Sequence, residues 1–270
     1  MAEFISYKGF HWEYESYGSG PEIMLAFHGF GNVCSDFKVL EPSLGGKYKI
    51  ISFNLPFHGN STIDPSVAEK TISKRHLKEF IEKVLNLQGA KKFSLMGYSL
   101  GGKIVLQLIE LFPGRINTAF LIAPDGLRPI VSNAFVTRSA LGKILYQRII
   151  NDPSGFFRLV DFLHRIKLVN RKMRDFIRES LSTRKKREMV WDVWMCFREL
   201  HPSVKKVQRI VNENGIRLHL FFGLYDRIIP PSIGQKFVKG ISDRHSLHIV
   251  EAGHNLVKEK LNKSLEEVTG

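Results

Sequence analysis

The sequence predicts an α/β fold with a mainly parallel sheet, and two observations support this prediction. Short apolar runs recur along the chain and end in polar or glycine-rich turns; residues 22–27, for example, lead into His28-Gly29-Phe30-Gly31. Helical apolar spacing separates these runs, as in the segment 74–87 that follows Ser73. Strands that alternate with helices tend to pair in parallel, and 270 residues suffice for one large domain.

Eight strands flanked by helices are expected, with a helical insertion after the sixth strand. The strands are a hairpin over 4–17, which contributes two, and then 22–27, 47–53, 93–97, 116–123, 217–223 and 246–250. Residues 127–210 show helical spacing and no strand pattern. We therefore predict a core made of residues 1–126 and 211–270, and a helical cap or lid made of residues 127–210.

The positive charge of the chain is concentrated in the same middle segment. The formal net charge is +14, and residues 126–210 carry 19 Lys/Arg against 7 Asp/Glu. Its basic clusters are Arg171, Lys172, Arg174 and Arg178, and then Arg184-Lys185-Lys186-Arg187. Charge of one sign near a cleft attracts anions, which favours an anionic substrate or an acidic carrier protein at this segment. An anionic membrane surface is a further candidate. Amphipathic helices that expose a charged face to solvent explain the basic residues equally well.

Other classes of function have little support in the sequence. The first residues show no secretory signal pattern, and no apolar run approaches the roughly 18 residues of a membrane span. Cys34 and Cys196 lie far apart and suggest neither a metal site nor a disulfide framework. No nucleic-acid reading motif accompanies the basic charge. A cytoplasmic protein with free thiols, no cofactor and no metal is expected.

One serine lies in a sequence context that is typical of a nucleophile. The apolar run that begins at Phe93 ends in Gly97-Tyr98-Ser99-Leu100-Gly101, and a helical pattern follows at once. A tight turn from a strand to a helix lifts a serine hydroxyl out of the backbone, and the flanking glycines leave room for the neighbouring strand and helix. The positive end of the helix then points to where negative charge develops. Ser99 is therefore the predicted nucleophile.

Five motifs in this order resemble those of the α/β-hydrolase superfamily over nearly the whole chain. They are His28-Gly29-Phe30-Gly31, Asn54-Leu55-Pro56-Phe57-His58-Gly59-Asn60-Ser61, Gly97-Tyr98-Ser99-Leu100-Gly101-Gly102, Gly223-Leu224-Tyr225-Asp226 and Gly253-His254-Asn255. Each follows a predicted strand, and open α/β sheets hold their sites at that edge. The chain departs from the superfamily's D-x-P-G-x-G-x-S pattern, which has Asp where this chain has Asn54 and Gly where it has Phe57.

The resemblance implies a catalytic triad of Ser99, Asp226 and His254. His254 would take the proton of Ser99, and Asp226 would fix the tautomer of His254. The resemblance also implies an oxyanion hole formed by the backbone N–H groups of Phe30 and Leu100, with His28, Gly29, Gly97 and Gly101 as supporting residues of the motifs. Asp125, which also follows a strand, is a rival acid, although Asp is common in such turns. His28 and His58 are interpreted as structural histidines.

A serine nucleophile favours acyl transfer to water. An ether formed on Ser99 could not be hydrolysed in a second step, which argues against an epoxide hydrolase or a haloalkane dehalogenase. A carboxylic ester or thioester of a small-molecule acyl group is the first expectation. Cleavage or elimination at a C–C bond is an alternative, because Gly97–Gly102 followed by Lys103 looks like the menaquinone-pathway lyase of this superfamily. A non-catalytic binding protein on the same scaffold is a third.

Overall fold

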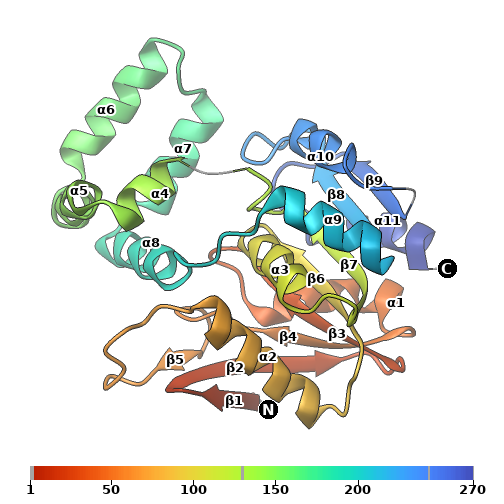
Figure 1. The fold of residues 1–270 in the computed structure, drawn as a ribbon. Coiled ribbons are helices and arrows are strands. Elements are labelled where there is room, and N and C mark those ends of the chain that lie inside the picture. The colour runs from red at the N-terminus through yellow and green to blue at the C-terminus, as the bar shows by residue number, and fades with distance from the viewer. Residues whose placement is uncertain (1–2, 129–130, 243, 270) are drawn as a thin grey trace. The chain divides into compact units, whose positions relative to one another are not determined.

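The core of the chain is a twisted sheet with helices on both faces (Figure 1). The computed structural model describes residues 3–128, 131–242 and 244–269. Its strands, in chain order, are β1 (Glu3–Tyr7), β2 (Phe10–Tyr17), β3 (Glu22–Phe27), β4 (Tyr48–Phe53), β5 (Thr62–Ile63), β6 (Phe93–Tyr98), β7 (Ile116–Ile122), β8 (Arg217–Gly223) and β9 (His245–Val250). This mainly parallel sheet confirms the predicted fold class.

The strand order brings the ends of distant segments to one edge of the sheet. The order is β1-β2-β4-β3-β6-β7-β8-β9, with β5 paired to β2 outside this path. From β4 onward every neighbouring pair is parallel, whereas β1, β2 and β5 pair antiparallel. The carboxyl ends of β3, β6, β7, β8 and β9 therefore lie along the same edge of the sheet. The predicted site residues are in the loops that follow these strand ends.

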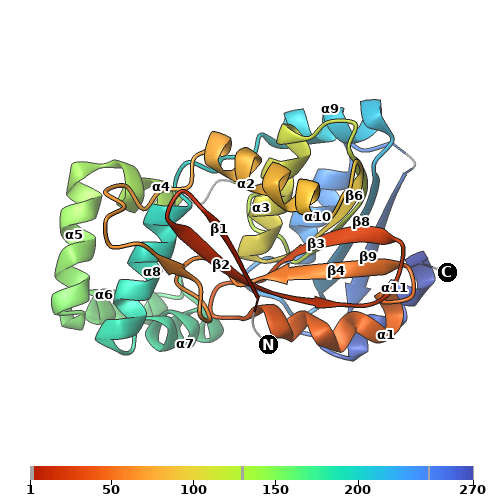
Figure 2. The same ribbon diagram turned by 90° about the horizontal axis from the view of Figure 1, so that it is seen from below.

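Helices cover both faces of the sheet and bury its apolar side chains (Figure 2). One face carries α2 (Lys74–Leu87), α3 (Leu100–Leu111) and α9 (Val204–Asn214). The other carries the 3-10 helix η1 (Cys34–Leu40), α1 (Glu41–Leu44) and α11 (Lys260–Thr269), whose Leu261 and Leu265 belong to a core cluster with strand residues such as Met96. The helix α10 (Pro231–Val238) follows β8. This burial supplies the hydrophobic stabilisation that holds the site edge rigid.

The local signals read from the sequence are mostly present as expected. Ser73 caps α2 by accepting a hydrogen bond from the backbone N–H of His76, and the hairpin of β1 and β2 turns at Lys8 and Gly9, both with positive φ. The strand β5 was not predicted. Its two residues pair with Phe10 and His11, and two residues are too few to show the alternation that marks a strand.

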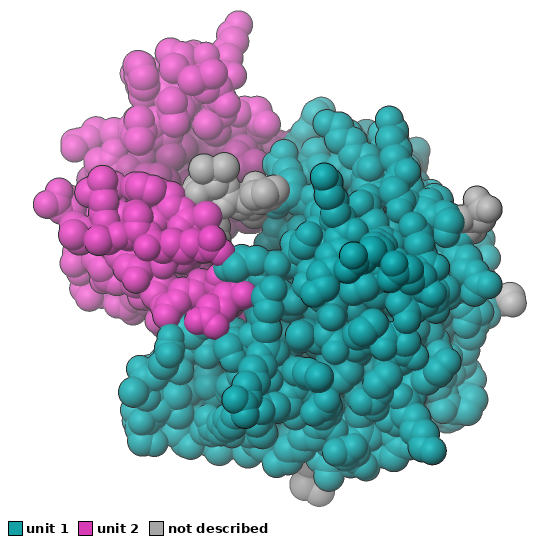
Figure 3. Space-filling view, in the orientation of Figure 1, with its two compact units in different colours: residues 1–128, 200–270 teal, residues 129–199 magenta. Residues whose placement is uncertain are grey.

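The chain divides into two compact units (Figure 3), which consist of residues 1–128 with 200–270 and of residues 129–199. The second unit has five helices within its described residues: α4 (Val131–Arg138), α5 (Ala140–Asn151), α6 (Ser154–Arg165), α7 (Arg171–Ser180) and α8 (Arg184–Cys196). The boundary predicted at 210/211 falls inside α9, which contacts α3 and belongs to the first unit. The role of the second unit as a lid stays a prediction.

Aromatic side chains of the second unit pack on one another. Trp191 stacks on Tyr146 with ring centroids 5.5 Å apart, and Trp194 lies 5.8 Å from the same ring. These contacts join α8 to α5, so the two tryptophans contribute to the stability of the unit itself.

Candidate active site

Ser99 lies at a sharp turn between β6 and α3. Its backbone has φ 50° and ψ −113°, a conformation that costs a non-glycine residue free energy and is found where the surrounding structure enforces it. The turn is held by its own hydrogen bonds, because the Ser99 carbonyl accepts from Gly102 and Asp125 at 2.9 and 2.8 Å. These hydrogen bonds therefore hold Ser99 in its strained conformation at the end of β6.

The glycines of the motif are required by close backbone contacts. A Cβ atom on Gly101 would lie 1.8 Å from the carbonyl oxygen of Phe27, and one on Gly97 would lie 2.5 Å from the carbonyl oxygen of Gly101. Because no side chain fits at either position, the pattern G-x-S-x-G here follows from packing between β3, β6 and α3. Gly29 is similarly restricted, because a Cβ there would lie 2.9 Å from the ring of Tyr98.

Asp226 follows β8 and His254 follows the neighbouring strand β9, and His254 lies between Asp226 and Ser99. The register pairs Gly223 with Val250, and the loops beyond them remain joined where the Tyr225 N–H donates to the Ala252 carbonyl at 2.9 Å. His254 Nε2 lies 3.1 Å from Ser99 Oγ, and His254 Nδ1 lies 2.7 Å from Asp226 Oδ2. The three residues predicted as a triad thus form a continuous hydrogen-bonded chain.

Asp226 is held by its backbone surroundings. Its side chain is almost fully buried, and its Oδ1 accepts hydrogen bonds from the N–H groups of Ile228 and Ile229 at 2.8 and 2.9 Å. Two donors on one oxygen leave the other oxygen directed at His254. The loop of His254 is fixed as well, because the Tyr98 hydroxyl donates to the His254 carbonyl at 3.0 Å. Burial raises the pKa of Tyr98, and so does the charge of Asp226, so this hydroxyl stays a donor.

Asp125 has a different partner. Its Oδ1 accepts from the N–H of the next residue, Gly126, at 2.7 Å, which is the local turn bond expected of an Asp in this context. Burial raises the pKa of Asp125. Within the described part of the chain, the carboxylate that contacts His254 is that of Asp226.

The loop that carries Phe30 starts beside the turn that carries Ser99. Phe27 at the end of β3 is paired in register with Gly97 near the end of β6. Leu100 is the first residue of α3, and the first N–H groups of a helix have no carbonyl partner within that helix. Phe30 lies between Gly29 and Gly31, and the Gly31 N–H donates to His58 Nε2 at 3.0 Å. The backbone therefore brings both predicted oxyanion-hole residues to the same strand edge.

His28 and His58 make the backbone contacts of structural histidines. The Leu55 N–H donates to His28 Nε2 at 3.0 Å, and His28 Nδ1 donates to the Gly29 carbonyl at 2.7 Å. Burial, with a smaller contribution from His58, lowers the pKa of His28 to about 3, and burial also lowers that of His58. Both rings are therefore neutral near pH 7, and both hold the loop of Phe30 against the loop that follows β4.

The structure adds a polar network that the sequence did not reveal. Glu13 of β2 is buried and accepts from both the backbone N–H and the side-chain amide of Asn60 at 2.7 Å. The side-chain amide of Asn54 also donates to Glu13, and its oxygen accepts from the Cys34 N–H at 2.7 Å. Burial acts to raise the pKa of Glu13, but these hydrogen bonds outweigh it and lower the pKa. The only signal for this network was the departure at Asn54.

The structure explains both positions at which this chain departs from the superfamily pattern, Asn54 and Phe57. An Asp at position 54 would face the Glu13 carboxylate, so the amide of Asn54 suits a chain that already supplies the negative charge from β2. Phe57 has φ 69°, which explains why the superfamily uses glycine there. A phenylalanine in this conformation costs about 1 kcal/mol.

We expect Asn54→Asp to lower the free energy of unfolding at pH 8 by about 2 kcal/mol, because a donor to Glu13 is lost and two carboxylates meet. Repulsion raises the folded-state pKa of the pair, so the loss should shrink as pH falls and one carboxyl binds a proton. Urea unfolding at several pH values measures this. Adding Glu13→Gln should restore part of the loss at pH 8, and equal losses at pH 8 and pH 5 would contradict the explanation.

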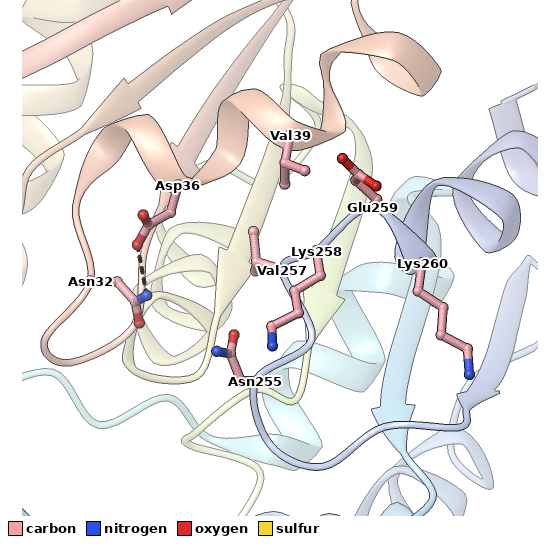
Figure 4. Close-up of a pocket in the computed structure, with 8 residues that line it drawn as sticks. All are labelled: Asn32, Asp36, Val39, Asn255, Val257, Lys258, Glu259 and Lys260. Atoms are coloured by element: carbon pink, nitrogen blue, oxygen red, sulfur yellow. Dashed lines mark hydrogen bonds between the residues drawn. The ribbon is translucent and has the colours of Figure 1, made fainter.

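A cavity of about 570 Å³ lies beside the site loops (Figure 4). It is lined by Asn32, Asp36, Val39, Asn255, Val257, Lys258, Glu259 and Lys260. Asn32 donates to Asp36 at 2.7 Å within it. Ser99, Asp226 and His254 are not among the lining residues, and the lining combines two carboxylates with two lysines. The cavity therefore indicates no particular charge class of ligand.

Among the described residues, no three His, Cys, Asp or Glu side chains come together in a way that could hold a metal ion. Within that same part of the chain, no helix combines the length and the apolar character that a bilayer-spanning helix requires.

Comparison with known proteins identifies relatives over most of the chain. A profile of the family described as alpha/beta hydrolase fold matches residues 22–261. The dihydrolipoyllysine-residue acetyltransferase component of the acetoin cleaving system of Cupriavidus necator is 24% identical over 262 residues, which are 96% of this chain and 66% of that protein. The zearalenone hydrolase of Cladophialophora bantiana is 31% identical over 109 residues, which are 40% of this chain and 41% of that protein. The chain thus spans less than two thirds of the length of either relative.

A solved structure shows the same fold. The thermophilic esterase of Thermogutta terrifontis superimposes with a TM-score of 0.66 at 18% identity, over 99% of this chain and 96% of the esterase. Such low identity shows likeness of fold alone, but the family profile covers well over half of the chain. The chain therefore belongs to the alpha/beta hydrolase fold family.

Proposed function

We propose that this chain is a serine hydrolase that cleaves a carboxylic ester or thioester of a small-molecule acyl group through an acyl-enzyme on Ser99. The observation that carries the proposal is the hydrogen-bonded sequence of Ser99, His254 and Asp226, with spacings of 3.1 and 2.7 Å. A hydroxyl, an imidazole and a buried carboxylate in this order are the groups that nucleophilic acyl transfer requires.

In the proposed acylation step, Ser99 Oγ attacks the carbonyl carbon while His254 Nε2 takes the hydroxyl proton. Asp226 stabilises the imidazolium and keeps the Nδ1 proton in place. The N–H groups of Phe30 and Leu100 would donate to the oxyanion, and losing one such donor typically costs about 10² to 10³ in rate. The proton on His254 then passes to the leaving alcohol or thiol as its bond to the acyl carbon breaks.

In the second step, water replaces the leaving group. His254 takes a proton from the water as its oxygen attacks the acyl carbon, and the tetrahedral intermediate collapses with return of that proton to Ser99 Oγ. The carboxylic acid leaves, and the free serine is restored. Both steps use the same residues, so a single geometry serves acylation and deacylation.

C–C bond cleavage and elimination use the same residues and remain the alternative. In hydrolysis a p-nitrophenyl ester should give a burst of nitrophenol equal to the enzyme sites, because its good leaving group makes acylation faster than deacylation and the acyl-enzyme accumulates. A panel of p-nitrophenyl esters, acyl thioesters and vinylogous diketones then separates the reaction classes. A burst on esters with inactivity on diketones supports the proposal, and turnover confined to diketones would assign the alternative.

We expect a fluorophosphonate to label one residue, Ser99, because its hydroxyl is the one hydrogen-bonded to the proposed base. Mass spectrometry of the tryptic peptide 93–103 measures the label. Ser246 is a matched internal control, because its Oγ also contacts histidines, His219 and His248, each at 2.8 Å. Label on Ser246 or elsewhere, with Ser99 unmodified, would refute the assignment.

A small-molecule substrate follows from hydrolase chemistry. An anionic substrate or an acidic carrier protein at the basic segment stays a prediction, as does a cytoplasmic location.

A further inference from the structure

Exposed apolar side chains are concentrated in one segment. Fourteen large apolar side chains are exposed among the described residues, and nine of them lie between positions 135 and 176. They are Phe135, Leu141, Ile144, Leu145, Leu159, Phe162, Ile166, Leu168 and Phe176. Single exposed apolar residues are ordinary, but a concentration of this kind marks an interaction surface.

The exposed residues of α5 form a stripe. Leu141, Ile144, Leu145 and Arg148 recur at intervals of three and four residues and are all exposed. At 3.6 residues per turn they occupy an arc of about 100°. Leu141 is 59% exposed, whereas Tyr146 on the opposite side is buried and stacks on Trp191. The helix therefore uses one side for its own unit and leaves the stripe uncovered.

The next helix, α6, repeats the arrangement. Arg158, Leu159, Phe162, Arg165 and Ile166 are exposed and fall within an arc of about 120°. Phe162 is 55% exposed, whereas Val160 on the opposite side is buried. Each of these two successive helices thus carries apolar side chains together with arginine on its own exposed arc.

The basic residues of the unit divide into two groups. Those of α7 and α8 mostly have partners: Arg174 pairs with Asp175, Arg178 with Asp161 and Arg184 with Glu188. Arg187 is buried and donates to the carbonyls of Ile150 and Leu181 at 3.1 and 2.9 Å. The cluster 184–187 is therefore not the free basic patch that the sequence suggested.

The basic side chains of α5 and α6 are available. Lys143, Arg148, Arg158 and Arg165 form no ion pair within 4.0 Å of a described residue. Arg158 and Arg165 make only smaller, longer-range contributions that lower the pKa values of Asp152 and Asp161. Arg148, Arg158 and Arg165 lie on the two exposed arcs. The same pair of helices therefore carries both the unpaired positive charge and the exposed apolar side chains.

We propose that α5 and α6 dock this chain on the surface of an anionic lipid bilayer. Leu and Phe side chains would enter the boundary between headgroups and acyl chains, while Arg148 on the α5 arc and Arg158 and Arg165 on the α6 arc reach lipid phosphates. An acidic protein that bound by charge alone would leave the apolar side chains without a partner. The docking is peripheral.

Sedimentation with vesicles tests the proposal. The intact chain should bind vesicles of phosphatidylglycerol and phosphatidylcholine and not vesicles of phosphatidylcholine alone. The apolar variant Leu141→Gln/Leu145→Gln/Phe162→Gln should lose about tenfold or more in partition coefficient. The charge variant Arg148→Gln/Arg158→Gln/Arg165→Gln should lose about a hundredfold, at about fivefold for each residue.

Matched controls use exposed residues of the other unit. Leu87→Gln, with a leucine that is 62% exposed on α2, and Lys91→Gln/Lys92→Gln/Lys263→Gln should bind vesicles as the intact chain does. Circular dichroism melting confirms that every variant is folded. Absence of vesicle binding by the intact chain, or equal binding by the apolar variant, would overturn the proposal. So would binding to an acidic acyl carrier protein with no binding to vesicles.

Discussion

Ser99→Ala should fold normally and lose essentially all turnover, with kcat lower by about 10⁶. The reason is that the Ser99 hydroxyl is the group within hydrogen-bond distance of His254 Nε2, and alanine supplies no nucleophile. The close contacts at Gly97 and Gly101 and the hydrogen bonds to the Ser99 carbonyl oxygen enforce the backbone turn. None of them involves the Ser99 hydroxyl, so alanine can adopt the same backbone conformation. Initial rates on a p-nitrophenyl ester measure the loss, and circular dichroism checks the fold.

Ser246→Ala is the matched control for this experiment. It removes another hydroxyl that contacts histidines, but one that does not lie at the turn between β6 and α3. Turnover should stay near that of the unmodified chain. Substantial activity in a pure Ser99→Ala preparation would exclude the proposed mechanism, whereas loss in both variants would point to a general structural effect.

Asp226→Asn should lower kcat by about 10⁴, because an amide at this position favours the wrong tautomer of His254. Asp226 Oδ2 accepts from His254 Nδ1 at 2.7 Å, and an asparagine that kept its oxygen on the N–H groups of Ile228 and Ile229 would direct its NH₂ at the imidazole. The ring could then no longer hold the Nδ1 proton while Nε2 acts as base.

Asp125→Asn separates the two candidate acids. The amide oxygen can still accept the Gly126 N–H, so turnover should change little. Steady-state kinetics on one ester, with KM and kcat resolved, compare the two variants. If the Asp125 variant were the more damaged, the acid of the mechanism would follow β7 and not β8.

Much of the fold was predictable from the sequence because its signals are local. Turn residues bound the apolar runs that predict β3, β6 and β8. Ser73 is an N-cap residue that marks the start of α2. The sequence context of Ser99 depends on a few neighbouring residues. Asp226 and His254 were predicted because each follows a strand in the order that the resemblance implies.

Other features depend on contacts between distant segments. The boundary within α9 could not be read from the helix, because its apolar face looks the same whether it packs on α3 or on the helices before it. The network of Glu13, Asn54 and Asn60 joins β2 to the loop after β4 across more than 40 positions, and no local pattern records such a pairing. Charge counts likewise could not show that Arg187 is buried.

The sequence by itself determined the alternation of strands and helices and the tight turn at Ser99, because these follow from propensities and spacings within single elements. The candidate partners of Ser99 came from the resemblance to the α/β-hydrolase superfamily. The tertiary structure alone decided that Asp226, and not Asp125, contacts His254, and that available arginines share α5 and α6 with uncovered leucines and phenylalanines. The physical reason is that hydrogen bonds and burial depend on distances through space, and folding fixes those distances by packing elements that are far apart in the chain.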